Sequence, residues 1–436
     1  MGILIRGGRA IDAQTHLDGI RDIYIDEGKI MRIGQGLKQE KAEDRVLDAA
    51  GCIVMPGIVD LHVHLRDPGQ TYKEDIGSGS QAAAAGGTTT IVAMPNTIPV
   101  IDSSVQAAIA RQKAAREAKI HILQAGSLTK GQEGRELSDM AGMAREGIRV
   151  LSEDGKSVMN AALCRDAFRQ AHRLGMLVCD HCEDINLRGE GCMNEDENAR
   201  RLGLPGISNS VEDVLTARDI LLAMETGVRL HLCHVSTRGV VEMLRLVRKL
   251  GYDNITAEAC PHHLILSSSD ILSDDPMYKM NPPLRRPEDV QALRDGLREG
   301  LIQAISTDHA PHAEDEKKGS MKTAAFGIVG LETSLPLIYT ELVEKGVLSL
   351  EAMVEKMCLN PARILGLPCG RLTQGAPADV IVADMKTSYR IDRNSFVSKG
   401  RNTPFNGRQV RGRVLVTICQ GDVVYQQKTF PACQEE

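Results

Sequence analysis

Eight short apolar segments alternate with segments of helical periodicity between residues 58 and 306, and this alternation constrains the fold most. The apolar segments are 58–64, 89–94, 120–123, 148–151, 176–179, 228–235, 254–257 and 301–306. Helical patterns lie between them near 75–86, 103–118, 137–146, 160–174, 210–226, 238–250 and 286–299. Eight strand–helix units over roughly 250 residues predict a (β/α)8 TIM-like barrel of the α/β class. An open doubly wound sheet is the alternative, but the chain has no Gly-rich dinucleotide-binding turn.

The two ends of the chain have a different pattern. Residues 1–55 read as short strands separated by turn residues, and strand patterns return from 367 to 436. Neither end is large enough to bury a good hydrophobic core alone. We therefore expect both ends to form one small composite β-sandwich beside a barrel that spans residues 56–366.

Composition narrows the class of protein. The formal net charge of −6 over 436 residues, without a basic cluster, argues against a nucleic-acid-binding protein. No apolar segment approaches the length that spans a membrane, and the first residues lack the pattern of a signal peptide. The eleven cysteines are scattered without the spacing of a disulfide framework. These features predict a cytoplasmic protein with reduced thiols.

Residues that can bind metal lie where the apolar segments end. The carboxyl ends of barrel strands meet at one rim, which carries the active site in enzymes of this fold. His62 and His64 lie two residues apart, so on a strand their side chains share one face. The later segment ends are followed by Asn96, Asp154, His181, His234, Asp308 and His312. An isolated pair of this kind would also fit a solvated strand, but four histidines and two aspartates at one rim predict a metal site.

The number of candidate ligands favours two metal ions. A catalytic zinc ion has three protein ligands and a water molecule, so six ligands with one shared carboxylate would hold a pair. Asp154 is the natural bridge, because a carboxylate offers two oxygen atoms. Two metals lower the pKa of a water held between them, and Asp308 is then the candidate catalytic group that accepts and returns the proton. Arg66 follows the histidine pair directly and is suited to bind a carboxylate.

Four motifs together resemble class I dihydroorotase, a bacterial family of the amidohydrolase superfamily. They are Asp60–Gly69, Met94–Asn96, Asn281–Arg285 and Asp308–His312. The resemblance runs through essentially the whole chain. It implies a barrel with a composite β-sandwich and the reversible, zinc-dependent cyclisation of N-carbamoyl-L-aspartate to L-dihydroorotate in de novo pyrimidine (UMP) biosynthesis.

The resemblance also implies roles for individual residues. It gives one Zn²⁺ to His62, His64 and Asp308, the other to His181 and His234, and the bridge to Asp154. The implied substrate contacts are His64, Arg66, Asn96, Asn281, His312 and the backbone of Phe326 and Gly327. Many members of the superfamily bridge their metals with a carbamylated lysine, whereas the aspartate at 154 is typical of one branch of class I dihydroorotases. Lys156 is the less favoured candidate for the bridge.

Several features stay open at the level of sequence. Residues 309–327 are polar and fit either a solvated surface turn or a flap over the site. Asp60 is a candidate to support a metal-binding histidine from behind, and His121 and His231 are interpreted as structural. His262 and His263 end the seventh segment without an assigned role.

Two other functions compete with the dihydroorotase interpretation. A hydantoinase or allantoinase would share the fold and the metals but would not need Arg66 beside the histidine pair. An inactive dihydroorotase-like scaffold for aspartate transcarbamoylase would have lost metal ligands, and here every ligand position is filled. The resemblance is also compatible with a homodimer and with association with aspartate transcarbamoylase.

Overall fold

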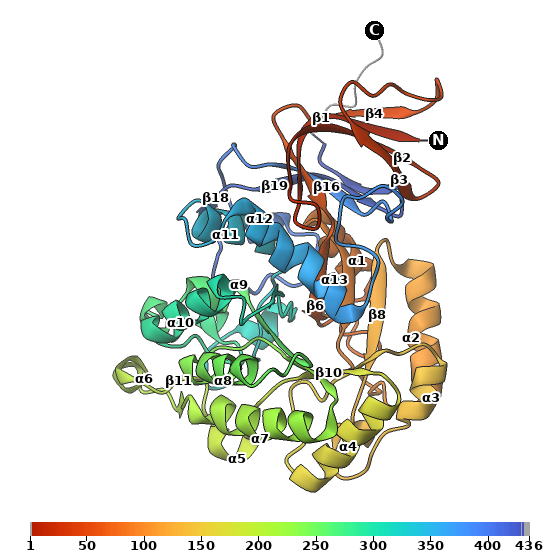
Figure 1. The fold of residues 1–436 in the computed structure, drawn as a ribbon. Helices are drawn as coiled ribbons and strands as arrows, with labels where there is room; N and C mark the ends of the chain where they lie inside the picture. Colours follow the sequence, from red (N-terminus) through yellow and green to blue (C-terminus); the bar gives the residue numbers. More distant parts are fainter. Residues whose placement is uncertain (1, 429, 431–436) are drawn as a thin grey trace.

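Eight parallel strands form the central barrel of the computed structural model, which describes residues 2–428 and 430 (Figure 1). In chain order they are β6 (Ile58–Val63), β7 (Thr88–Ala93), β8 (His121–Gly126), β9 (Val150–Leu151), β10 (Leu177–Asp180), β13 (Arg229–Leu232), β14 (Ile255–Ala259) and β15 (Ala304–Ile305). Each strand pairs with its neighbour in this order. A parallel bridge between Val63 and His309 joins the two edges. The predicted (β/α)8 barrel is confirmed.

The barrel helices lie close to their predicted positions. They are α1 (Ile76–Ala85), α2 (Ser104–Glu117), α3 (Met140–Arg145), α4 (Ala161–Arg173), α7 (Ser210–Thr226), α8 (Arg238–Lys249) and α10 (Pro287–Arg298). A longer helical region follows, with α11 (Ser334–Ile338), α12 (Leu350–Val354) and α13 (Asn360–Leu365). Between these helices the chain widens into π-helical turns over Tyr339–Val343 and Glu355–Leu359. Hydrophobic periodicity does not distinguish such a turn from an α-helix, because the backbone hydrogen bonds of the two differ in span by only one residue.

The segment between β10 and α7 forms a small insertion at the rim. It contains α5 (Ile185–Arg188) and α6 (Glu197–Leu202), with a parallel pair of β11 (Met193–Asn194) and β12 (Gly206–Ile207). No described helix has the length and apolar character needed to cross a membrane.

Both ends of the chain contribute to one eight-stranded sheet outside the barrel. Its strands are β1 (Ile3–Asp12), β2 (Leu17–Asp26), β3 (Lys29–Gly34), β4 (Arg45–Asp48), β5 (Ile53–Pro56), β16 (Val380–Asp384), β19 (Arg413–Cys419) and β20 (Asp422–Gln426). The first half of β1 pairs with β4 and its second half with β5, so one long strand serves both parts of the sheet. Side chains from β1, β2, β5, β16 and β19 share a separate hydrophobic core. The sheet thus packs against itself, as expected of a composite sandwich.

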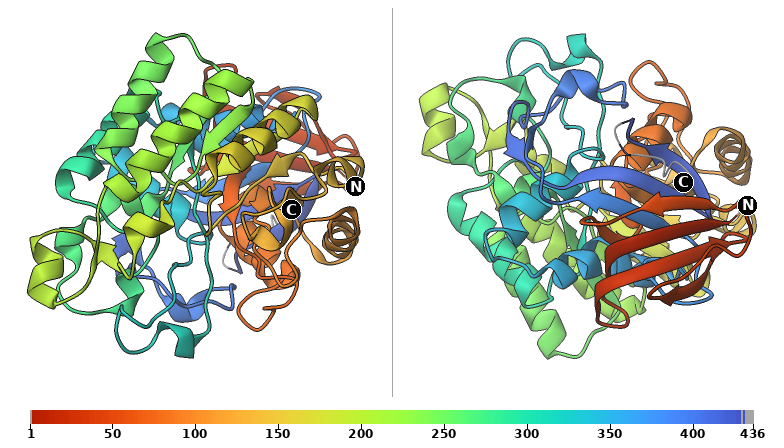
Figure 2. Two further views of the ribbon diagram at one scale, coloured as in Figure 1. Left: turned by 90° about the horizontal axis from the view of Figure 1, so that it is seen from below. Right: turned by 90° about the horizontal axis from the view of Figure 1, so that it is seen from above.

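This sheet packs against one side of the barrel, near the first residues of β6, β7 and β8 and opposite the rim (Figures 1 and 2). The hydroxyl of Thr417 in β19 donates a hydrogen bond to the carbonyl of Ala84 in α1, over 2.6 Å. The amide of Gly57, between β5 and β6, donates to the carbonyl of Asp379 over 2.9 Å. These contacts lie at the amino-terminal ends of the strands, so the carboxyl ends face the other way.

Candidate metal centre and substrate cavity

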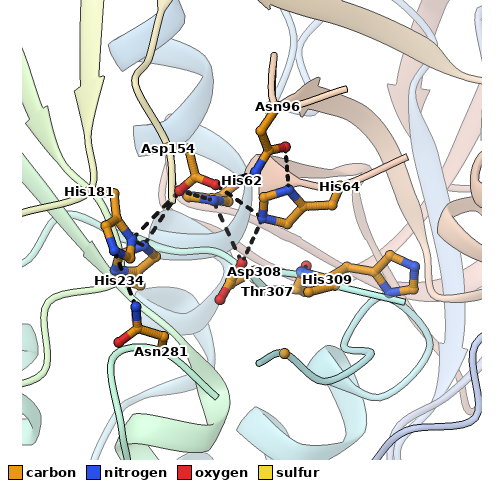
Figure 3. Close-up of polar contacts among 12 residues, drawn as sticks. His62, His64, Asn96, Asp154, His181, His234, Asn281, Thr307, Asp308 and His309 are labelled. Carbon is orange, nitrogen blue, oxygen red and sulfur yellow. Dashed lines mark hydrogen bonds and ion pairs between the residues drawn. The ribbon is translucent and has the colours of Figure 1, made fainter. Parts of the chain in front are cut away.

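Six histidine and aspartate side chains meet at the carboxyl ends of the barrel strands (Figure 3). His62 lies in β6 and His64 just after it, while the other four follow different strands. They are Asp154 after β9, His181 after β10, His234 after β13 and Asp308 after β15. All six are buried. The structure brings together every residue that the sequence suggested as a metal ligand.

Asp154 lies at the middle of this group. Its Oδ1 atom is 3.2 Å from Nε2 of His62, and its Oδ2 atom is 3.4 Å from Nε2 of His64. On the other side Oδ1 is 3.7 Å from Nδ1 of His181 and 3.9 Å from Nε2 of His234. One carboxylate therefore faces two pairs of imidazoles.

Asp308 approaches only one of these pairs. Its Oδ1 atom lies 3.1 Å from Nε2 of His64 and 3.6 Å from Nε2 of His62. The backbone at Asp308 has φ 48°, as strained as that of Arg66 (φ 57°) and His234 (φ 33°). Left-handed backbone is costly for non-glycine residues and is found where a site fixes a side chain direction. The strand ends are thus bent to aim these three side chains inward.

The donor atoms fit a pair of metal ions. Those of His62, His64 and Asp154 all lie within 4.8 Å of one another, and so do those of Asp154, His181 and His234. Among the described residues, both ring nitrogens of His62 and Nδ1 of His234 are buried without a hydrogen-bond partner. Buried polar atoms in this state are costly and rare in proteins. A shared metal centre would satisfy Nε2 of His62, which is the one of these nitrogens that faces Asp154.

The close approach of these buried side chains shifts their pKa values and so determines their charges. Burial acts to lower the pKa of His62, but the Asp154 carboxylate raises that pKa well above its ordinary value. Burial acts to raise the pKa of Asp154, and the imidazoles of His62 and His64 hold it well below the usual range. Burial also acts to lower the pKa of His181, but the hydrogen bond to Glu183 raises that pKa to about 9. Asp154 is therefore ionised at neutral pH, and cations are strongly favoured around it.

A cavity of about 160 Å³ opens beside the centre. It is lined by His64, Arg66, Asn96, Asp154, Gly155, His181, Glu183, Arg188, His234, Asn281, Asp308, Ala310, Phe326 and Gly327. All the predicted substrate contacts except His312 are in this lining. Two hollows of about 660 Å³ elsewhere on the described surface are larger, but no histidine lines either of them.

His312 supports the cavity wall from behind. Its Nε2 atom lies 2.8 Å from the carbonyl of Phe326 and 3.3 Å from the guanidinium of Arg66. Burial and the neighbouring Arg66 charge lower the pKa of His312 to about 3. A neutral His312 therefore joins Arg66 to the Phe326–Gly327 backbone, with Gly327 at φ 124°, where a side chain would be strained.

Asn96 and Asn281 hold the two sides of the cavity. Asn96 accepts from Nδ1 of His64 over 3.0 Å and donates to Oδ2 of Asp154 over 3.0 Å. Asn281 donates to Oε1 of Glu183 over 2.9 Å and lies 3.5 Å from Nε2 of His181. Each asparagine thus touches one half of the metal centre.

Glu258, rather than Asp60, lies behind the imidazole of His62. Its Oε1 atom is 3.6 Å from Nδ1 of His62, and its Oε2 atom is 3.1 Å from Nε2 of His231. Asp60 instead accepts from the backbone amides of His62 and Thr307. The sequence could not indicate this, because Glu258 reaches His62 across the barrel interior from β14.

Other neighbours of the site were also not evident from the sequence. Asn402 accepts from the amide of His312 over 3.1 Å and donates to the carbonyl of Gly327 over 3.0 Å. It comes from an irregular segment that carries no periodic pattern. Lys156 is exposed, whereas Asp154 is buried between the histidines, so the geometry favours the aspartate as the bridge.

The 309–327 segment is anchored to the protein beside the cavity. The Lys317 ammonium is buried and donates to the carbonyls of Lys279, Ala325 and Gly327 over 2.9–3.0 Å. A solvated surface turn would not bury a lysine in this way. The segment therefore forms a wall of the cavity through Phe326 and Gly327.

Comparison with known proteins identifies the family. Residues 51–240 match the family model described as Dihydro-orotase-like. The dihydroorotase of Pelotomaculum thermopropionicum is 46% identical over 430 residues, which cover 99% of this chain and 100% of the relative. That of Geotalea daltonii is 44% identical, with 98% and 99% covered. The chain belongs to the dihydroorotase family. As a member of this family it is a metal-dependent cyclic amidohydrolase.

Solved structures place the dihydroorotase fold among related hydrolases. An L-hydantoinase (dihydropyrimidinase) from Arthrobacter aurescens superposes with a TM-score of 0.87 at 27% identity, covering 98% of this chain and 97% of the other. A dihydropyrimidinase from Brevibacillus agri gives 0.85 at 25% identity, covering 99% and 96%. The barrel and the β-domain are thus shared across cyclic amidohydrolases, while the full-length similarity in sequence is to dihydroorotases.

Proposed function

We propose that the chain interconverts N-carbamoyl-L-aspartate and L-dihydroorotate in pyrimidine biosynthesis, using two zinc ions. The observation that carries this proposal is the placement of Arg66 and Asp154 in the lining of one small cavity. Arg66 is a cation that can bind a carboxylate at one side of the cavity, and the metal centre around Asp154 can open a ring at the other side. Together they match a cyclic amide that bears a carboxylate.

We assign His62, His64 and Asp308 to one zinc ion, His181 and His234 to the other, and Asp154 to both. Imidazole and carboxylate donors suit zinc. When bound, such ions would supply Lewis acidity and would lower the pKa of a bound water.

Asp308 is proposed to move the proton. Burial acts to raise the pKa of Asp308, but the hydrogen bond with His64 and the charges of His62 and His64 lower it below its ordinary value. The carboxylate is therefore ionised at neutral pH. In ring opening it accepts a proton from the attacking water and delivers it to the ring nitrogen as the carbon–nitrogen bond breaks. In ring closure the same proton returns to the carboxyl oxygen that leaves as water.

Arg66, Asn96 and His312 are proposed to hold the substrate carboxylate, with Asn281 and the backbone of Phe326 and Gly327 against the ring. Arg66 already donates to the carbonyl of Pro311 over 3.2 Å, which fixes its side chain before the substrate arrives. His64, which bonds both Asn96 and Asp308, lies between the carboxylate subsite and the metal centre.

Ring opening of L-dihydroorotate, hydantoin and allantoin by one zinc-loaded preparation tests this proposal. We expect turnover of dihydroorotate alone, its loss on chelation and its return with zinc. Preferential turnover of hydantoin would instead support the substrate class of the structural neighbours. The lack of any turnover with bound zinc would favour a scaffold role.

We also propose a cytoplasmic location, a homodimer, and association with aspartate transcarbamoylase. The ten cysteines of the described residues are unpaired, which suits a reducing compartment. Light scattering of the protein alone and mixed with the transcarbamoylase tests both assemblies.

We keep 1–55, 56–366 and 367–436 as the proposed boundaries of the sandwich and the barrel, and limited proteolysis would check them.

A further inference from the structure

A second cluster of metal-binding side chains lies at the base of the barrel, far from the rim in the fold. His121 begins β8, Asp379 directly precedes β16, and Cys419 ends β19. Their donor atoms all lie within 4.8 Å of one another. The three residues come from the barrel and from the β-domain, and they meet only because the sheet packs against the first residues of β7 and β8.

Asp379 is incompletely satisfied in this cluster. It is 2% exposed, and its Oδ1 atom accepts from the amide of Gln420 over 2.9 Å. Among the described residues, its Oδ2 atom has no hydrogen-bond partner, and Nε2 of His121 lies 3.4 Å away from it. A buried carboxylate oxygen without a partner is costly, and a cation would remove that cost.

The other two donors are placed to share such a cation. Cys419 is 5% exposed, and its Sγ atom lies 3.7 Å from the carbonyl of Thr89 in β7. The His121 side chain is 30% exposed and borders a cavity of about 490 Å³, which Cys419 and Gln420 also line. The cluster is thus closed on the Asp379 side and open to the cavity on the His121 side.

We propose that His121, Asp379 and Cys419 bind a zinc-class divalent metal ion that joins the β-domain to the barrel base. Thiolate, imidazole and carboxylate are the protein ligands of zinc, and water from the cavity would complete four-fold coordination. Such an ion would stabilise the junction, because its ligands come together only in the folded state.

The Cys419 thiol allows an experiment to distinguish this site from the rim site, because the proposed rim ligands are histidine and aspartate only. Cobalt(II) bound to a thiolate gives a charge-transfer band in the near ultraviolet, which imidazole and carboxylate ligands do not give. Chelated protein should be titrated with cobalt(II) and the band recorded for the wild type, Cys419→Ser and His121→Gln. Cys52→Ser is the matched control, since Cys52 is a half-buried cysteine that is not part of the His121, Asp379 and Cys419 cluster.

We expect the band in the wild type and Cys52→Ser, its loss in Cys419→Ser, and a shift of its titration midpoint to higher cobalt concentration in His121→Gln. Zinc-loaded Cys419→Ser should still open dihydroorotate at the wild-type rate while binding one metal ion fewer. The absence of the band in cobalt-saturated wild type would overturn the proposal. So would a band that persists in Cys419→Ser, which would place the metal at Cys233 or Cys260. His121→Gln changes a partly exposed residue, so it keeps the test valid if Cys419→Ser fails to fold.

Discussion

The two ends of the barrel gather the same kinds of side chain in different ways. At the rim, Arg66, His234 and Asp308 have left-handed backbone and lie just past strand ends. At the base, the backbone of His121, Asp379 and Cys419 is ordinary, and the cluster forms where one domain meets another. Strained backbone at the rim fixes directions for chemistry, whereas the base needs only a contact between domains. We therefore expect rim substitutions to alter turnover and base substitutions to alter metal content and stability.

The largest effect should come from the proposed proton carrier. Asp308→Asn removes the charge but keeps the shape, and kcat for dihydroorotate ring opening should fall by about 10²–10⁴-fold or more, as for other general acid–base groups. Asp315→Asn changes an exposed aspartate of the following segment and is the control. An Asp308→Asn enzyme with nearly normal kcat would remove the chemical distinction between the two ends.

A smaller effect is expected from the carboxylate subsite. Arg66→Lys keeps the charge but loses the planar guanidinium, so KM for dihydroorotate should rise roughly 10- to 100-fold, the range of one or two charge-assisted hydrogen bonds. The kcat value should change much less. Steady-state kinetics separate the two parameters, and Arg135→Lys, at an 84% exposed side chain, is the control. A fall in kcat with unchanged KM would place Arg66 in the chemical step instead.

The wall of the cavity should respond more weakly. Lys317→Met removes the buried ammonium that binds three carbonyls, and the free energy of unfolding should fall by about 1–3 kcal/mol, with a several-fold rise in KM. Lys318→Met, one residue on with a 63% exposed side chain, should change neither. Denaturant unfolding and kinetics on both variants provide the measurement. Equal behaviour of the two variants would mean that the segment is a surface turn.

The last prediction concerns only the pH dependence of stability and a half-buried acid outside both clusters. Burial raises the pKa of Glu332 to about 7, although the amides of Val397 and Ser398 donate to it. The folded state then holds a proton that the unfolded state loses near pH 4.5, so the contribution of Glu332 to stability is greatest below that pH and is lost as pH rises through 7. Glu332→Gln should remove up to about 3 kcal/mol of this dependence between pH 5 and 8. Melting curves of the wild type and Glu332→Gln at several pH values check the sign, and a difference in stability between the two that grows with pH in favour of the wild type would contradict it.

Local pattern predicted the barrel and its rim well. The eight apolar segments lie at the eight strands, and the rule that sites occupy strand carboxyl ends led to all six proposed ligands. The eighth strand is only Ala304–Ile305, shorter than its apolar segment, because the chain turns into the site immediately afterwards. The sequence pattern could not predict contacts between segments that lie far apart in the chain. Glu258 behind His62 and Asn402 behind His312 reach the site from distant segments.

The base cluster shows the same limit more strongly. Nothing local to His121 marks it as more than a structural histidine, since its neighbours Asp379 and Cys419 are more than 250 residues away in the chain. Only the docking of the β-domain reveals the group. A sequence therefore indicates a site at the ends of repeated barrel strands more readily than a site formed where two domains come into contact.

The central claim is that two metal ions sharing Asp154 form the catalytic centre. The most direct test is a zinc titration of chelated Cys419→Ser protein, followed by dihydroorotate ring opening at each addition, because this variant lacks the proposed base site. Activity should be absent without zinc, rise with each addition and saturate at two zinc ions per chain. Full activity at a single zinc ion, or turnover by the metal-free protein, would contradict the account.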